Sequence, residues 1–421
     1  MSPASVDPSA LGEKALEWLI DSAVETDVGL RWSTTRTSQD LAPTLYGGSA
    51  GIVMALLEAH CHFGDDRYAD VAVSASRELR QSHENWDDYS LYFGTMGMAV
   101  ALQSVYEVLG DADAGASAMQ IVDRVRERFD GERWGDLFEL LGGNAGIALG
   151  ALRLGDIELA TIAITPYVER AEPTAAGVNW PHRIGATSRL HHVSHGTLGI
   201  VAALAAVGDA TRRADFIEVA LAGAADVVSR NESTDGGFLV PHSDPQYRPE
   251  IIERYSYGWC HGPTGDAQVF RLLAAVTGDV AWMDLTDRCW RTVTTSGLPE
   301  RLRPGFWDNS GRCCGTSGVL ALAGDRFVEQ GEDLAFADVL VEDIYARSTI
   351  DAAGARWSNY EHRATPSELD PCNGWAMGNA GIIRELLRFS RLKEGRSPDY
   401  FVPWPDQPAT VPRVFGEKSS L

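Results

Sequence analysis

The chain alternates between two kinds of segment, and both carry their apolar residues at the period of an α-helix. Segments such as 52–63, 98–109 and 382–394 place hydrophobic residues at helical spacing, and several are apolar on nearly every face. The segments between them, such as 65–82 and 210–231, are more polar. The pattern predicts an all-α protein in which each repeat contains one inner, buried helix and one outer helix.

A glycine-spaced signature precedes each inner segment. Seven copies occur, GSAGI at Gly48, GTMGM at Gly94, GNAGI at Gly143, GTLGI at Gly196, GPTGD at Gly262, GTSGV at Gly315 and GNAGI at Gly378. Most inner helices are predicted to end at a further glycine, namely Gly64, Gly110, Gly155, Gly208, Gly278 and Gly395. A helical hairpin cannot bury its apolar face alone, so the repeats must stack. Because the inner helices are too apolar to line an open groove, we expect a closed α/α ring with the glycine turns gathered at one end.

Composition and charge argue against some classes of function. The 421 residues are 44% hydrophobic and 23% charged, as in a globular protein, and the net charge of −23 argues against nucleic-acid binding. No apolar run approaches the ~20 residues of a membrane span and no signal peptide opens the chain, so the expected location is cytoplasmic. Residues 1–396 are predicted to form one ring domain. Residues 397–421 are predicted to form a proline-rich tail that lies over the surface or is partly mobile.

Cysteines decorate two consecutive glycine turns. The fifth turn reads WCHG, with Cys260 and His261, and the sixth reads RCCG, with Cys313 and Cys314. If adjacent repeats superpose, these four potential ligands converge. Thiolates suit zinc, and three protein ligands with an open fourth position are typical of a catalytic zinc site. There are two alternatives: the adjacent cysteines only pack in the core, or they form a redox switch. Neither explains why the cysteines fall on consecutive turns. The remaining cysteines are interpreted as ordinary core or surface residues; they are Cys61, Cys289 and Cys372.

The seven glycine turns together with WCHG and CCG resemble the lanthionine synthetase C-like family, the cyclases that close thioether rings in lanthipeptides. The resemblance covers about residues 40–392. It implies an α/α toroid of seven outer and seven inner helices with one zinc ion. The commoner family pattern has Cys-His-Gly as its second motif. Here the motif is Cys-Cys-Gly, as in a three-cysteine subset, so the resemblance places zinc on Cys260, Cys313 and Cys314 and leaves His261 as a neighbour.

The resemblance also implies a reaction. A peptide cysteine adds to dehydroalanine or dehydrobutyrine in the same peptide and gives lanthionine or methyllanthionine. Three thiolate ligands make an electron-rich site that holds the incoming sulfur less tightly than a site with a neutral histidine, which keeps that sulfur nucleophilic. The family mechanism needs a general acid, and the matching residue is His195, directly before the fourth glycine turn. His191 and His192 lack that position.

Two further family positions are altered in this chain. An aspartate four residues before the third glycine pair falls on Glu139, and Asp136 is the alternative one helical turn earlier. An arginine four residues before the first zinc cysteine falls on Ser256, so Arg254 is the nearest replacement. With His195 and the neighbouring His261, Glu139 and Arg254 complete the candidate catalytic group.

The sequence contains no P-loop and no kinase-type catalytic loop, so the chain is not expected to dehydrate serine or threonine itself. The expected partners are a dehydrated precursor peptide and a separate kinase or lyase dehydratase, unless the chain is part of a larger synthetase. Two alternatives stay open. One is addition of glutathione or another thiol to dehydroamino acids, and the other is a non-catalytic peptide-binding scaffold with a structural zinc. A carbohydrate-active α/α barrel is disfavoured, because the turns carry no pair of carboxylates.

Overall fold

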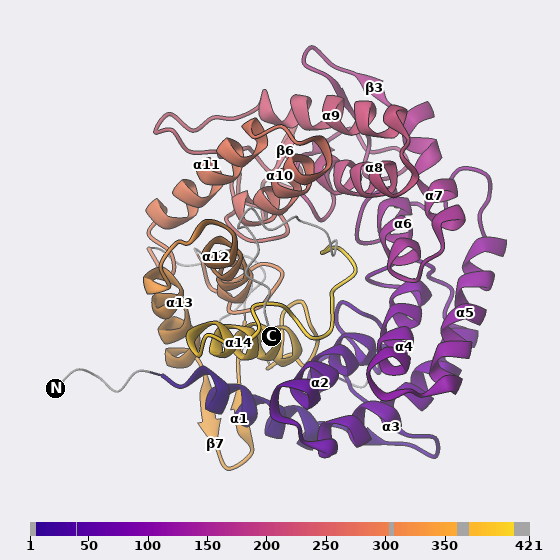
Figure 1. Cartoon of the computed structure of the whole chain (residues 1–421), viewed down its shortest axis with the longest axis vertical. Coiled ribbons are helices and arrows are strands. Elements are labelled where there is room, and N and C mark those ends of the chain that lie inside the picture. Colours follow the sequence, from indigo (N-terminus) through magenta and orange to yellow (C-terminus); the bar gives the residue numbers. More distant parts are fainter. Residues whose placement is uncertain (1–5, 39, 303–306, 360–369, 408–421) are drawn as a thin grey trace, which may run out of the picture.

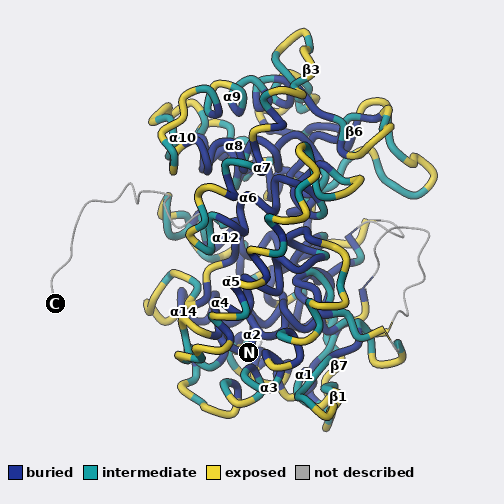
Figure 2. Tube along the Cα trace, turned by 90° about the vertical axis from the view of Figure 1, so that its right-hand side faces the viewer, coloured by how far each residue is buried: buried dark blue, intermediate teal, exposed yellow. Residues whose placement is uncertain are grey.

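The computed structural model describes residues 6–38, 40–302, 307–359 and 370–407. The described residues form fourteen α-helices, arranged as an inner and an outer layer around one central axis (Figure 1). Seen from the side, buried residues fill the middle of the molecule and exposed residues lie at its edges (Figure 2). The predicted α/α toroid is therefore confirmed.

Each glycine signature begins an inner helix, and an outer helix follows it. The inner helices are α2 (Ser49–Phe63), α4 (Thr95–Leu109), α6 (Asn144–Arg153), α8 (Thr197–Thr211), α10 (Pro263–Thr277), α12 (Thr316–Gln330) and α14 (Asn379–Lys393). The outer helices are α1 (Pro8–Asp21), α3 (Asp66–Ser82), α5 (Ala112–Glu127), α7 (Ile157–Glu169), α9 (Ala214–Val228), α11 (Ala281–Thr295) and α13 (Ala335–Ala346). Six outer helices pack against the inner helix before them in sequence, whereas α1 packs against α14 from the other end of the chain. The two ends of the chain thus close the ring together.

A circuit of backbone hydrogen bonds runs around the ring at the glycine turns. Its members lie two residues before the first glycine of each signature. Each amide donates to the next carbonyl over 2.9 to 3.3 Å, in the order Tyr46, Tyr92, Leu141, Ser194, Cys260, Cys313, Ala376 and back to Tyr46. We call this circuit the amide belt. Because it returns to its first member, it fixes all seven turns relative to one another.

The second glycine of each signature is required by close packing between turns. A Cβ on Gly146 would lie 2.0 Å from the carbonyl oxygen of Leu140 in its own turn and 2.9 Å from Cβ of Leu91 in the preceding turn. At the closing contact, a Cβ on Gly51 would lie 3.0 Å from Cβ of Trp375 in the last turn. No side chain fits at such positions without a shift of its neighbours, which explains why the signature recurs.

The predicted helix ends are correct in part. Gly64, Gly110 and Gly278 end their helices in the left-handed conformation. The predicted end at Gly208 is wrong, because α8 continues to Thr211 and ends at Arg212. Gly208 serves packing instead, since a Cβ there would lie 2.6 Å from Cδ1 of Ile217 on α9.

The strands are short antiparallel pairs in the loops. They are β1 (Val24–Glu25) with β2 (Leu30–Arg31), β3 (Glu172–Pro173) with β4 (Val178–Asn179), β5 (Arg189–Leu190) with β6 (Ser243–Asp244), and β7 (Thr349–Asp351) with β8 (Gly354–Arg356). In the third pair, Leu190 lies opposite Ser243. That pair joins the segment before the fourth glycine turn to the segment before the fifth.

The first part of the C-terminal tail runs into the centre of the ring, where it forms the last described stretch of chain (Figure 1). Trp404 is only 3% exposed and stacks on Trp375, with ring centroids 4.6 Å apart. The expected surface location is therefore wrong for the buried residues Val402, Trp404 and Asp406, whereas residues 408–421 lie outside the described part of the chain. Among the described helices, none has the length and apolar character to cross a membrane.

Candidate metal centre

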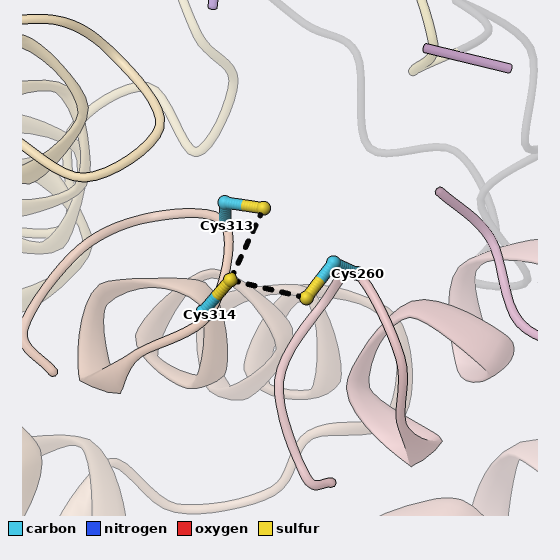
Figure 3. A group of neighbouring side chains, drawn as sticks. All are labelled: Cys260, Cys313 and Cys314. Atoms are coloured by element: carbon cyan, nitrogen blue, oxygen red, sulfur yellow. Dashed lines mark hydrogen bonds between the residues drawn. The ribbon is translucent and has the colours of Figure 1, made fainter. Parts of the chain in front are cut away.

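Three cysteines meet at two neighbouring glycine turns, those that precede α10 and α12. The Sγ atoms of Cys260 and Cys314 are 3.2 Å apart, and those of Cys314 and Cys313 are 3.5 Å apart (Figure 3). The amide belt places them, because the amide of Cys260 donates to the carbonyl of Cys313 over 3.1 Å. The structure thus brings together the three residues that the family resemblance predicts as ligands.

The chemistry of this cluster fits a zinc ion. The three sulfurs lie within 4.8 Å of one another, and Cys260 and Cys313 are 4% and 1% exposed. A tetrahedral zinc with bonds of ~2.3 Å separates its sulfur ligands by about 3.8 Å, so small shifts of the side chains are enough to admit it. Soft thiolate donors favour zinc over magnesium or calcium. The cluster has the donor set of a site with three protein ligands and one open position.

The three thiols do not ionise alike. Interactions with Cys260 and then Cys314 hold the pKa of Cys313 well below its ordinary value. The pKa of Cys260 is raised well above its ordinary value, chiefly by its interaction with Cys313, and that of Cys314 is raised chiefly by Cys260. Of the three thiols, only that of Cys313 is thus shifted toward the thiolate form.

Tyr46 contacts the cluster from the first glycine turn, and the sequence analysis missed it. Its hydroxyl donates a hydrogen bond to Sγ of Cys313 over 3.5 Å. In the amide belt, Ala376 is the one member between Tyr46 and Cys313. Tyr46 and Cys313 both lie two residues before a glycine signature, and this shared position is visible in the sequence. It indicates a contact between the two residues only once the ring is known to close.

His195 lies beside the cluster in the fourth glycine turn and is paired with Glu139. Nδ1 of His195 is 3.2 Å from Oε1 of Glu139, which is fully buried and also accepts the amides of Leu141 and Gly142. Burial acts to lower the pKa of His195, but the charge and hydrogen bond of Glu139 and the charge of Cys313 outweigh it, so this pKa is raised. A third of the His195 side chain is exposed, so the ring is accessible from outside.

A second group of histidines packs behind His195. The ring of His261 stacks 5.7 Å from that of His195 and lies 4.2 Å from that of His242, and Nε2 of His261 is 3.2 Å from Oγ of Ser194. Burial, and next the charge of His242, lower the pKa of His261 well below its ordinary value, so it is neutral. His242 lies in a loop without a motif, and no sequence signal indicated it.

The sequence left His192 without a role, and the structure pairs it with a carboxylate. Nδ1 of His192 is 2.9 Å from Asp266, the last residue of the fifth signature, and both side chains are buried. Asp266 lies in the first turn of α10, and the ring of His192 is 6.3 Å from that of His261.

Two candidates from the sequence are placed elsewhere. The guanidinium of Arg254 is half exposed and pairs with Glu232 and Tyr255 at the surface, so the structure does not bring it to the cysteines. Only its carbonyl reaches the histidine group, by accepting the amide of His242 over 2.7 Å. Asp136 is exposed, whereas Glu139 is buried against His195, so Glu139 is the carboxylate that the structure supports.

Comparisons with known proteins identify the family and the fold. The model of the family "Lanthionine synthetase C-like protein" matches residues 39–250 and 248–341. Nisin cyclase is similar in structure, with 15% identity, a TM-score of 0.63 and coverage of 93% of this chain and 95% of that one. The Lin0763 protein of Listeria innocua matches at 12% identity and TM-score 0.54, over 93% of this chain and 99% of its own. An α-1,6-mannanase of Salegentibacter sp. matches at 12% identity and TM-score 0.50, over 90% of this chain and 98% of its own.

These structural likenesses show the fold alone, and no curated protein sequence matches the chain. On the family match, the chain belongs to the lanthionine synthetase C-like family.

Proposed function

We propose that the protein is a zinc-dependent lanthipeptide cyclase, which forms lanthionine and methyllanthionine by adding peptide cysteine thiols to dehydroalanine and dehydrobutyrine. One observation carries the proposal. Three cysteine sulfurs from neighbouring turns lie within 4.8 Å of one another, and His195 is near enough for the charge of Cys313 to raise its pKa. The cysteine cluster, which would activate the nucleophile, thus lies beside His195, which would donate the proton. The similarity to nisin cyclase supports a peptide substrate.

Cys260, Cys313 and Cys314 would hold Zn²⁺, which stabilises the deprotonated form of an incoming peptide thiol. The thiol loses its proton, its sulfur forms a bond to the β-carbon of the dehydro residue, and the carbon–carbon π bond breaks. The electron pair of that bond becomes the enolate of the α-carbon. His195 then donates its proton to the α-carbon and is reprotonated from the solvent water that took up the thiol proton, so the overall reaction is an addition with no other product.

The residues around His195 serve this proton transfer. Buried Glu139 raises the pKa of His195, which favours the protonated ring, and fixes that ring through Nδ1, which leaves Nε2 free to face the substrate. Neutral His261 stacks on the ring of His195 and is itself oriented by Ser194. Arg254 stays a candidate, but its side chain would have to leave Glu232 in order to reach a substrate.

The proposal is tested with a dehydrated precursor peptide and the purified chain. After incubation, free thiols are counted by alkylation and mass spectrometry. We expect the count of free thiols to fall while the mass of the unalkylated peptide is unchanged, because ring closure is an addition within one molecule. Cys260→Ala should abolish the loss of thiols, and Cys61→Ala, a cysteine outside the cluster, should not.

The same assay separates the alternatives. A peptide that keeps all its thiols but binds tightly would support a scaffold and contradict the cyclase. If glutathione is included and the peptide mass rises by one or more glutathione units in preference to ring closure, the protein adds an external thiol instead. Partnership with a separate dehydratase is part of the proposal, and supplying the undehydrated precursor should give no reaction.

A further inference from the structure

Residues 398–407 are held inside the ring by charged side chains that are themselves buried. Glu58 on α2 accepts the amides of Phe401 and Val402, and three arginines on α14 donate to tail carbonyls. These donations are Arg384 to Val402, Arg388 to Pro398 and Arg391 to Asp399, over 2.7 to 3.0 Å. A buried charge that loses a partner is strongly destabilised. The tail therefore completes the interior of the ring.

The end of this segment reaches the inner side of the glycine turns. Nε1 of Trp404 donates to the hydroxyl of Tyr92 over 3.0 Å, and that hydroxyl donates to Asp406 over 2.7 Å. The indole of Trp404 also stacks on Trp375 with an angle of 13° between the rings. Trp404 and Asp406 thus contact two turn residues, one before α4 and one before α14.

Both of these turn residues adjoin the metal centre. Tyr92 accepts the amide of Tyr46 over 2.9 Å, and the ring of Tyr46 meets those of Tyr92 and Trp375 edge-on. Ala376, the residue after Trp375, accepts the amide of Cys313 over 2.9 Å. From the tail to Cys313 there is thus a continuous series of contacts, which ends in the hydrogen bond from Tyr46 to Sγ of Cys313.

We propose that Trp404 and Asp406 are positioning residues of the metal centre, which fix Tyr92 and Trp375 and thereby hold the Tyr46 hydroxyl against Cys313. A donor to a ligand sulfur orients that sulfur and stabilises its negative charge. Changes to such outer partners typically reduce metal affinity by about 10- to 100-fold. The inference concerns metal binding alone and holds whichever reaction the site performs.

The test is the zinc dissociation constant of the full chain, measured by competition with a chromogenic chelator. We expect Trp404→Ala and Tyr46→Phe each to weaken zinc binding about 10-fold. Because both act through one hydrogen bond, the double variant should be little weaker than either single variant. Phe401→Ala is the matched control, since Phe401 is in the same segment but is 37% exposed and lies over Arg391. It should bind zinc as the unchanged chain does.

A spectroscopic signature separates positioning from general damage. In the cobalt-substituted chain, Trp404→Ala and Tyr46→Phe should shift the thiolate-to-cobalt charge-transfer band in the same direction. Trp404→Phe, which keeps a ring for stacking but lacks the indole donor, should give an intermediate shift and guards against misfolding of the alanine variant. Unchanged zinc affinity and cobalt spectrum in both Trp404 variants would overturn the proposal. So would a double variant whose loss equals the product of the two single losses.

Discussion

At the scale of single residues, the cysteine cluster is placed by backbone contacts. The amide of Cys260 donates to Cys313 and the amide of Cys313 donates to Ala376, so the positions of two ligands are set by the amide belt. Little further conformational entropy is lost when such a preformed set of ligands binds a metal. The charges of the cluster, in contrast, must change on binding, because only Cys313 has a lowered pKa.

Zinc binding should release at least two protons at neutral pH, because the raised pKa values of Cys260 and Cys314 keep both thiols protonated until they become ligands. The apparent affinity for zinc should consequently rise with pH. Calorimetric titration in two buffers of different ionisation enthalpy measures the number of protons. A binding heat that is the same in both buffers would show that the thiols are already ionised.

Ring closure should lose activity on the alkaline side as pH rises through the pKa of His195, which lies above the ordinary value of 6.5. Glu139→Gln removes the charge that raises this pKa and leaves the burial that lowers it. The alkaline loss should therefore move to lower pH in this variant, with a lower rate at neutral pH. Exposed Asp136→Asn is the control and should keep the original profile. A Glu139→Gln profile that matches the unchanged chain would remove Glu139 from the mechanism.

At the scale of elements, the glycine turn is the unit that the sequence predicts best. A Gly-x-x-Gly pair before an apolar helix is a local signal, and all seven copies begin inner helices in the structure. Helix ends are less readable, because a glycine such as Gly208 can serve close packing as well as termination. The position of Arg254 could not be predicted for another reason. Its loop carries no repeat that would fix its position relative to the cysteines.

Gly146→Ala should destabilise the ring by about 1–3 kcal/mol, because its Cβ would overlap the carbonyl of Leu140 and crowd Leu91. Gly135→Ala is the control, since a Cβ there has no neighbour within 4 Å. Chemical denaturation followed by circular dichroism gives both free energies of unfolding. Equal stabilities of the two variants would contradict the packing explanation of the signature.

At the scale of the whole molecule, closure depends on contacts between the two ends of the chain. The sequence predicts stacking of repeats from their glycine turns, and it favours a ring from the apolar character of the inner helices. It does not show that α1 covers α14, because α1 precedes the first signature. Nor does it show that the tail enters the ring, because proline-rich sequence with isolated aromatic residues is typical of surface segments. Buried partners such as Glu58 and Arg391 decide its location, and Glu58 lies far away in sequence.

Leu16→Ala on α1 should lower the free energy of unfolding by about 2–5 kcal/mol while the chain still unfolds in one transition. Leu16 is fully buried in the core, and a closed ring has no free end that can unfold by itself. Val339→Ala on α13, where Val339 is 46% exposed, should have little effect. Separate melting of the terminal helices in the Leu16 variant, seen as a second transition, would indicate an open stack of repeats.

We expect Cys260, Cys313 and Cys314 to bind one zinc ion and to leave one coordination position open to a substrate. X-ray absorption at the zinc edge, measured on the zinc-loaded chain alone, determines the ligands of the ion. We expect one zinc per chain, with three sulfur ligands at ~2.3 Å and one lighter oxygen ligand. A first shell made mainly of nitrogen and oxygen, or a chain that retains no zinc, would contradict it.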